Sequence, residues 1–231
     1  MKGIFASLKS EITLNVALAK ENEKTAEMRQ FIDEFTSVSD RLKAEYNEVE
    51  GQKLRFGLVR DGQPTGISFR GIPNGHEFTS LLLAVLNADG QGKNFPDETT
   101  QRRIKALKGN IALKTYVSLT CTNCPDVVQA LNLMSLINPN IRHEMIDGGL
   151  FQQEVSELGI QGVPAVYCNG ESLHIGRGDL GILLQKLEDM VGSETDDNAE
   201  PVEHHHDVIV VGGGPAGASA AIYSARKGLR V

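Results

Sequence analysis

The segment "SLTCTNCPDVVQALNLMSLIN", residues 118–138, places two cysteines three positions apart. It begins within a run typical of a strand, "IALKTYVSLT" (residues 111–120), and its later apolar residues recur at helical spacing. We therefore expect a strand that extends to the end of this run and a helix over residues 125–137. Cys121 then lies just before the helix, and Cys124 lies one turn into it.

A helix start favours an ionised thiol, because unpaired backbone N–H groups and the positive end of the helix dipole face it. Such placement lowers the pKa of a cysteine. Cys121 would be the exposed, attacking thiol, and Cys124, shielded by the helix, would resolve a mixed disulfide. The alternative is two ordinary thiols with a chance spacing, and a chain with three cysteines has too few for a disulfide scaffold.

A metal site is a weaker interpretation of the cysteine pair. Zinc usually takes four ligands, so a second pair of Cys or His would be needed. Cys168 stands alone in a predicted strand, where we expect a buried thiol that packs like a small apolar residue. His204, His205 and His206 are consecutive and lack the spacing that brings two ligands to one helix face, so we assign them to a solvated linker.

Val163 and Pro164, in "GVPAVY", come directly before a predicted strand. A proline at the first position of a strand removes no hydrogen bond from the sheet interior. The residues alone do not decide whether the peptide bond between them is cis or trans.

The same order of elements occurs twice along the chain. Asp61-Gly62 and Asn169-Gly170 each supply the turn of a predicted hairpin. In the first copy we expect strands at 11–18, 42–50, 53–60 and 65–72 with helices at 23–39 and 76–88; in the second, strands at 111–120, 141–147 and 165–175 with helices at 99–107, 125–137, 151–159 and 179–192.

The last part of the chain differs in character. Residues 193–206 are acidic and nearly free of apolar residues, as in a solvated linker. "DVIVV" then predicts a strand that leads into Gly212, Gly214 and Gly217, and a helix follows. A G-x-G-x-x-G pattern between a strand and a helix lets a pyrophosphate approach the helix N-terminus.

Composition excludes some classes of function. The 231 residues carry a formal net charge of −7 and are 40% hydrophobic, which is typical of a globular protein. Binding nucleic acid needs clustered Lys and Arg that this chain does not supply. No window approaches the about 20 apolar residues of a membrane span, and the N-terminus lacks the features of a secretory signal. We therefore expect a cytoplasmic protein without a nucleic-acid or membrane partner.

Several of these segments together resemble one family. Residues 118–155, "GVPAVYCNGE", "GHEFTSLLLAVL" and the closing "DVIVVGGGPAGASAAIYSARKGLRV" resemble, in the same order, the flavoprotein subunit of bacterial alkyl hydroperoxide reductase, the AhpF family. The resemblance covers the N-terminal domain of that family and the start of its FAD domain.

The resemblance implies an α/β fold with two tandem thioredoxin-like folds. Residues 1–100 would form a fold without a cysteine pair, because "LAKENEK" stands where a pair would be. Residues 101–192 would carry the redox-active pair, 193–206 the linker, and 207–231 the first β-α unit of a Rossmann-like FAD-binding domain.

The resemblance also implies a function, namely a thiol–disulfide oxidoreductase domain of an NADH-dependent peroxiredoxin reductase. NADH would reduce FAD in the parent protein, a second dithiol in the C-terminal flavin domain would follow, and Cys121 and Cys124 would then reduce a two-cysteine peroxiredoxin. Pro164 would be a cis-proline facing the pair. The glycines Gly212, Gly214 and Gly217 would belong to the FAD site, and the parent protein would be a homodimer.

Glu77 lies at the start of a predicted helix, where the helix dipole favours a carboxylate. From the residues alone, we would assign Glu77 a structural role at the helix start. The resemblance makes it a candidate acid/base near the cysteine pair, and a buried carboxyl group should then have a raised pKa. His76 beside it is expected to be exposed.

Two other functions stay open at this point. The chain could be an autonomous disulfide reductase, or a non-catalytic module whose first half docks a partner. We also expect these 231 residues to bind no FAD by themselves, because one strand and one helix cannot bury a dinucleotide.

Overall fold

The computed structural model describes residues 3–19, 22–50, 54–92, 94–194 and 205–231. The chain divides into two compact units, Met1–Glu194 and Thr195–Val231. The linker predicted at 193–206 lies largely outside the described residues, as does His204.

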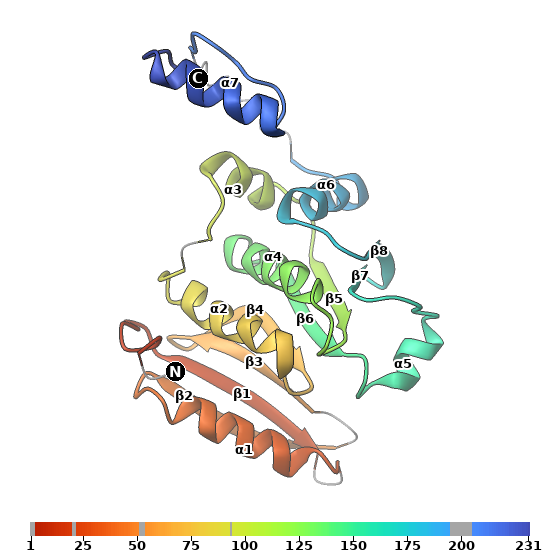
Figure 1. The fold of residues 1–231 in the computed structure, drawn as a ribbon. Coiled ribbons are helices and arrows are strands. Elements are labelled where there is room, and N and C mark those ends of the chain that lie inside the picture. The colour runs from red at the N-terminus through yellow and green to blue at the C-terminus, as the bar shows by residue number, and fades with distance from the viewer. Residues whose placement is uncertain (1–2, 20–21, 51–53, 93, 195–204) are drawn as a thin grey trace. The chain divides into compact units, whose positions relative to one another are not determined.

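One eight-stranded sheet forms the first unit, with the strand order β2-β1-β3-β4-β6-β5-β7-β8 (Figure 1). The order within the first four strands is the same as the order within the last four, which agrees with the repeat predicted from the sequence. The first half consists of β1 (Ile12–Ala19), α1 (Thr25–Thr36), β2 (Leu42–Val49), β3 (Leu54–Arg60), β4 (Gln63–Arg70), the 3₁₀ turn η1 (Gly75–Glu77) and α2 (Phe78–Ala88).

The second half repeats the pattern, with one additional helix before its first strand and one between β6 and β7. It consists of α3 (Glu98–Lys105), β5 (Ile111–Val117), α4 (Cys124–Ile137), β6 (Ile141–Asp147), α5 (Gln152–Glu157), β7 (Ala165–Cys168), β8 (Glu171–Ile175) and α6 (Leu180–Val191). The halves join where β4 pairs with β6 in parallel, from Ile67 opposite His143 to Arg70 opposite Ile146. The predicted boundary between residues 100 and 101 falls inside α3, and the division into domains stays a prediction.

Local sequence explains the strands and hairpins. In the middle of β1, Leu14, Val16 and Leu18 lie on one face and are buried, while on the other face Asn15 is exposed and Ala17 is half-buried, the pattern of a sheet covered more fully on one face. The turn after β3 has positive φ at both Asp61 (47°) and Gly62 (79°). Such angles suit the two-residue hairpin that Asp-Gly favours.

The two halves share a hydrophobic core. Phe56 and Phe69 stack with their ring centroids 5.2 Å apart under the first half of the sheet. The same cluster includes Cys124 and Val128 of α4 and Met145 of β6. Because α4 also packs against α2 and strand β4, the helix that carries Cys124 rests on both halves (Figure 1).

Two expectations near the cysteines were wrong in detail. The strand predicted to continue to Thr120 ends at Val117, because the chain turns there and the Cys121 N–H donates to the Ser118 carbonyl at 2.9 Å. Cys124 is the first residue of α4 instead of lying one turn inside it. Both cysteines therefore lie at the helix start.

The predicted strand at "DVIVV" does not form. Its residues have no β-partner among the described residues, and Ile209 and Val211 are 77% and 95% exposed. The N–H groups of Asp207 and Val208 donate to the Arg230 carbonyl, but an apolar run without a neighbouring strand does not form a β-ladder. The helix expected after the three glycines is present as α7 (Pro215–Arg226), but it begins before Gly217 instead of after it. No helix in the described ranges is both long and apolar enough to cross a lipid bilayer.

Candidate redox site

Cys121 and Cys124 are joined by a disulfide, with their Cα atoms 5.5 Å apart. The loop after β5 positions Cys121, and α4 positions Cys124. Cys124 is fully buried, whereas Cys121 is partly exposed. Pro125 occupies the first turn of α4, where its missing N–H removes no helical hydrogen bond. One sulfur of the pair is thus accessible at a helix N-terminus, and the other is shielded behind it.

The sequence left open whether the peptide bond between Val163 and Pro164 is cis or trans. In the structure it is cis. The Cys121 sulfur lies 3.9 Å from the Val163 carbonyl oxygen. The Pro164 carbonyl accepts a hydrogen bond of 2.8 Å from Gly176 N–H. The loop before β7 therefore borders the accessible sulfur.

Glu77 of η1 is fully buried, and neither of its carboxylate oxygens has a hydrogen-bond partner among the described residues. Burial raises the pKa of its carboxyl group to about 7, against a smaller lowering by the nearby Ser80 hydroxyl, which lies outside normal hydrogen-bond geometry. The direction is the one expected from the sequence. His76 beside it is exposed, as expected.

The η1 turn is attached to the cysteine loop. His76 N–H donates to the Leu119 carbonyl at 3.1 Å. A Cβ on Gly75, whose φ is 57°, would lie 2.4 Å from that same oxygen, so only glycine permits this approach. Glu77 of the first half is in this way held close to the loop that carries Cys121. In the first half the corresponding loop has no cysteine, and its Lys20 and Glu21 lie outside the described residues.

A buried polar group behind α4 was missed by the sequence reasoning. His143 of β6 is almost fully buried, with Nδ1 2.7 Å from Asn132 Oδ1 and Nε2 2.8 Å from Thr115 Oγ. The contact with Asn132 Oδ1 assigns the proton to Nδ1, so the Thr115 hydroxyl donates to Nε2. The signal was present in "IRHEMID", where His143 takes the same alternate position as the core residues Ile141 and Met145.

We expect the imidazole of His143 to stay neutral, with its proton on Nδ1, from about pH 8 down to about pH 4. Burial lowers its pKa to about 3. Imidazole ¹⁵N spectra recorded over this pH range would test the expected neutral form of His143. The urea-unfolded chain provides the reference, because His143 titrates there as an ordinary histidine. A folded-state His143 signal that changes between neutral pH and about pH 5 would contradict the assignment.

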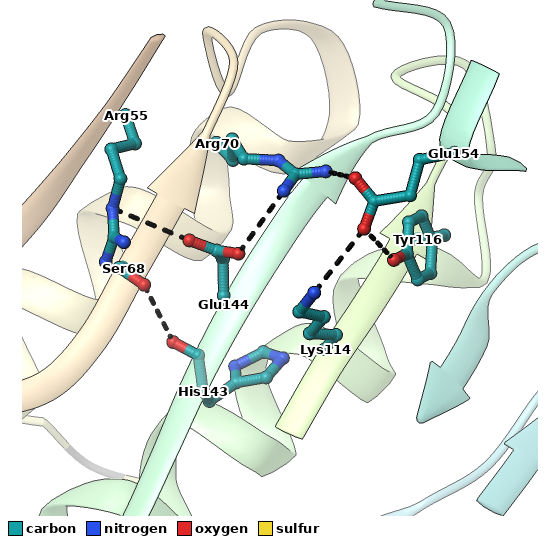
Figure 2. Close-up of polar contacts among 8 residues, drawn as sticks. All are labelled: Arg55, Ser68, Arg70, Lys114, Tyr116, His143, Glu144 and Glu154. Carbon is teal, nitrogen blue, oxygen red and sulfur yellow. Dashed lines mark hydrogen bonds and ion pairs between the residues drawn. The ribbon is translucent and has the colours of Figure 1, made fainter. Parts of the chain in front are cut away.

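A network of charged side chains spans the junction between the halves on the face of the sheet opposite α4 (Figure 2). Arg70 of β4 forms an ion pair with Glu154 of α5 and lies 3.9 Å from a Glu144 carboxylate oxygen. Arg55 of β3 lies 3.6 Å from the other oxygen of Glu144. The Tyr116 hydroxyl also donates to Glu154. Sequence reasoning did not find this network.

The glycine pattern at 212–217 forms a close turn at the start of α7. Gly212 has a φ of 117°, and a Cβ on Gly217 would lie 2.0 Å from the Gly212 carbonyl oxygen. Gly214 is the N-cap residue of α7. Glycine is thus required at 212 and 217, and the loop fits the requirement for close approach of a phosphate to a helix N-terminus.

Cys168 is a buried free thiol, and burial raises its pKa, in agreement with the packing role expected for it. Within the described parts of the chain, no group of three or more His, Cys, Asp or Glu side chains is placed to hold a metal ion.

Known proteins share this fold. A crystal structure of the NTD_N/C domain of alkyl hydroperoxide reductase AhpF from Enterococcus faecalis superimposes with a TM-score of 0.74 at 34% identity, over 80% of this chain and 95% of that domain. The chain belongs to the AhpF family. A family model described as a thioredoxin domain matches residues 111–187 of this AhpF-family chain, the half with the cysteine pair.

Longer relatives agree with the assignment. The AhpF component of alkyl hydroperoxide reductase from Staphylococcus aureus is 45% identical over 93% of the chain, and a protein named NADH dehydrogenase from Bacillus subtilis is 46% identical over 96%. The chain spans about two fifths of the length of these relatives. A protein disulfide oxidoreductase from Aeropyrum pernix has the same fold, with a TM-score of 0.74 at 18% identity.

Proposed function

We propose that this AhpF-family chain is a thiol–disulfide oxidoreductase domain that reduces the disulfide of a two-cysteine peroxiredoxin. One observation supports it above all. Of the two bonded sulfurs at the start of α4, Cys121 is partly exposed beside the cis-proline loop and Cys124 is fully buried. This asymmetry supports an attacking role for Cys121 and a resolving role for Cys124.

The exchange starts from the reduced pair. The Cys121 thiolate attacks one sulfur of the partner disulfide, the partner S–S bond breaks, and the leaving sulfur takes up a proton. The Cys124 thiol then loses its proton and attacks Cys121, which forms the intramolecular disulfide and releases the second partner sulfur as a thiol. The partner gains two electrons from the pair and two protons from water, and the pair ends oxidised.

We assign proton transfer to Glu77. Its carboxyl group is buried, has a pKa of about 7, and is held close to the cysteine loop by η1. A group with a pKa near the working pH can both accept and return a proton. Glu77 would accept the proton that Cys124 loses and return it when the pair is reduced again.

The parent protein would supply the electrons. The glycine loop at Gly212, Gly214 and Gly217 would hold the pyrophosphate of FAD, which when bound passes electrons from NADH toward a second dithiol in the C-terminal flavin domain. That dithiol would reduce Cys121 and Cys124. The parent protein would be a cytoplasmic homodimer, and the 231 residues alone would bind no FAD.

Trapping the mixed disulfide tests the proposal. A reduced Cys124→Ser variant, mixed with an oxidised bacterial two-cysteine peroxiredoxin, should form a covalent adduct that persists on a non-reducing gel. The Cys121→Ser variant is the matched control and should form none. An adduct with both variants, or with neither when the chain is folded and its thiols titrate, would contradict the proposed roles.

Two other functions predict different results. An autonomous reductase would form adducts equally well with unrelated protein disulfides. A docking module would bind the peroxiredoxin without any adduct, and Cys121→Ser would leave the activity of the parent protein unchanged.

A further inference from the structure

The helix before the cis-proline loop has little support of its own. α5 contains six residues, and none of them is buried. Isolated helices this short are not stable in water, so contacts outside the helix must hold α5 in place. Its position matters, because the chain continues from α5 directly into the loop with Val163 and Pro164.

One polar contact of α5 comes from the first half of the sheet. Arg70 belongs to β4, and its guanidinium group pairs with Glu154 of α5 (Figure 2). The same guanidinium group lies 4.3 Å above the centre of the Phe151 ring, at the N-cap of α5. Arg70 is only 18% exposed, so the pair is partly shielded from water and stronger than a surface ion pair.

Glu154 is the centre of this arrangement. It also accepts from the Tyr116 hydroxyl and lies 3.4 Å from Lys114 Nζ. Burial alone would raise the pKa of Glu154, but the hydrogen bonds from Tyr116 and Arg70 and the nearby positive charges lower it overall. The carboxylate thus stays charged at neutral pH and keeps α5 attached to the sheet.

The contacts continue from α5 to the redox site. Ile160 N–H donates to the Val155 carbonyl at 3.0 Å, and both side chains pack against the small cluster around Tyr116. The loop then reaches Val163, whose carbonyl oxygen lies 3.9 Å from the Cys121 sulfur. A displacement of α5 would therefore move the edge of the site that borders the attacking sulfur.

We propose that Arg70 is a positioning residue through which the cysteine-free half holds the cis-proline loop in place for a protein disulfide. The inference rests on the proposed exchange reaction. A protein disulfide that reaches Cys121 must lie against this loop, whereas a small disulfide reagent can approach the exposed sulfur without it. Loss of Arg70 should therefore affect protein substrates selectively.

Arg55 provides a matched control. It also connects the halves, since it pairs with Glu144 across the same junction at 3.6 Å. It lies on the same face of the sheet, but its ion pair is with β6 and not with α5 (Figure 2). If the network only joins the two halves, the alanine variants of Arg55 and Arg70 should behave alike.

The experiment compares the wild-type 231-residue chain with Arg70→Ala and Arg55→Ala. For each we would reduce the cysteine pair beforehand and measure single-turnover reduction of an oxidised two-cysteine peroxiredoxin at increasing peroxiredoxin concentration, together with the rate at which the reduced pair reacts with dithiobis(nitrobenzoate). Arg70→Ala should lower the second-order rate constant for the peroxiredoxin by about tenfold, mainly by raising the half-saturation concentration, and leave the reagent rate within about twofold of wild type. Arg55→Ala should change neither.

The outcomes separate the two proposals. A wild-type chain that does not reduce the peroxiredoxin would contradict the proposed function and this inference with it. An active wild type, with Arg70→Ala no different from Arg55→Ala or equally slow toward both substrates, would contradict the inference alone. If Arg70→Ala does not fold, Glu154→Gln removes the charge from the α5 side and should show the same selective loss.

Discussion

Glu77→Gln should abolish a pH dependence of stability that the wild-type chain shows around neutral pH. Burial raises the pKa of Glu77 from its ordinary 4.5 to about 7, so the folded state holds a proton that the unfolded state releases. The stability this contributes is fully present below pH 4.5 and is lost as the pH rises through about 7. The loss should reach on the order of 3 kcal/mol at alkaline pH, because each pKa unit corresponds to about 1.4 kcal/mol.

Urea unfolding at a series of pH values from about 5 to about 8 measures this effect. Because its side chain is neutral throughout, Glu77→Gln should show a free energy of unfolding that changes less with pH than that of wild type. The control Glu157→Gln alters an exposed carboxylate and should show the same pH dependence as wild type. If the free energy of unfolding depended on pH in the same way for wild type and Glu77→Gln, the carboxyl group of Glu77 would have no raised pKa.

The same substitution tests the proposed proton transfer. Removal of a general acid/base typically costs about 10²-fold or more in rate. Glu77→Gln should therefore slow the release of the partner from the mixed disulfide by about this factor, while formation of the adduct with Cys121 changes less. Rapid-quench measurement of adduct formation and decay would distinguish the two steps. Equal rates of adduct decay in wild type and Glu77→Gln would show that Glu77 takes no part in the proton transfer.

Phe69→Ala should destabilise both halves of the first unit at once. The ring is fully buried, stacks on Phe56, and belongs to the same cluster as Cys124 and Met145 of the second half. Replacing a buried phenylalanine by alanine costs about 3–5 kcal/mol, because apolar contacts are lost and a cavity remains. We expect the free energy of unfolding to fall by this amount.

Circular dichroism in urea, together with alkylation of Cys168 as a probe of the second half, would measure the change. Both signals should shift to the same lower midpoint, and Phe69→Leu, which leaves a smaller cavity, should shift it less. A Cys168 transition that stays at the wild-type midpoint would show that the second half is stable without the first.

Much of the fold follows from local patterns. The apolar pattern of β1 and the turn residues Asp61-Gly62 predicted strands of the first half close to their observed bounds. Apolar periodicity and turn chemistry depend only on nearby residues, which is why the sequence shows them. Patterns cannot show whether two halves share a sheet, since the β4 and β6 pairing joins residues far apart in the chain. The expected strand at "DVIVV" was wrong for the same reason, because a strand depends on a neighbour as well as on its own residues.

The site was accessible to sequence reasoning only in part. The cysteine pair was visible from its spacing and the helix after it, and Glu77 only through the family resemblance. The contact between Arg70 and Glu154 joins residues 84 positions apart, and no local pattern marks either of them. His143 could have been found, because a histidine at a core-facing strand position needs buried partners.

The continuous sheet also limits exposure of strand edges. Two separate four-stranded sheets would present four edge strands, each with unpaired backbone groups that can recruit other chains. The pairing of β4 with β6 covers two of these edges and leaves only β2 and β8 at the ends of the sheet as described. Fusion of two similar folds has thus given the first unit resistance to edge-to-edge aggregation that neither fold would have by itself.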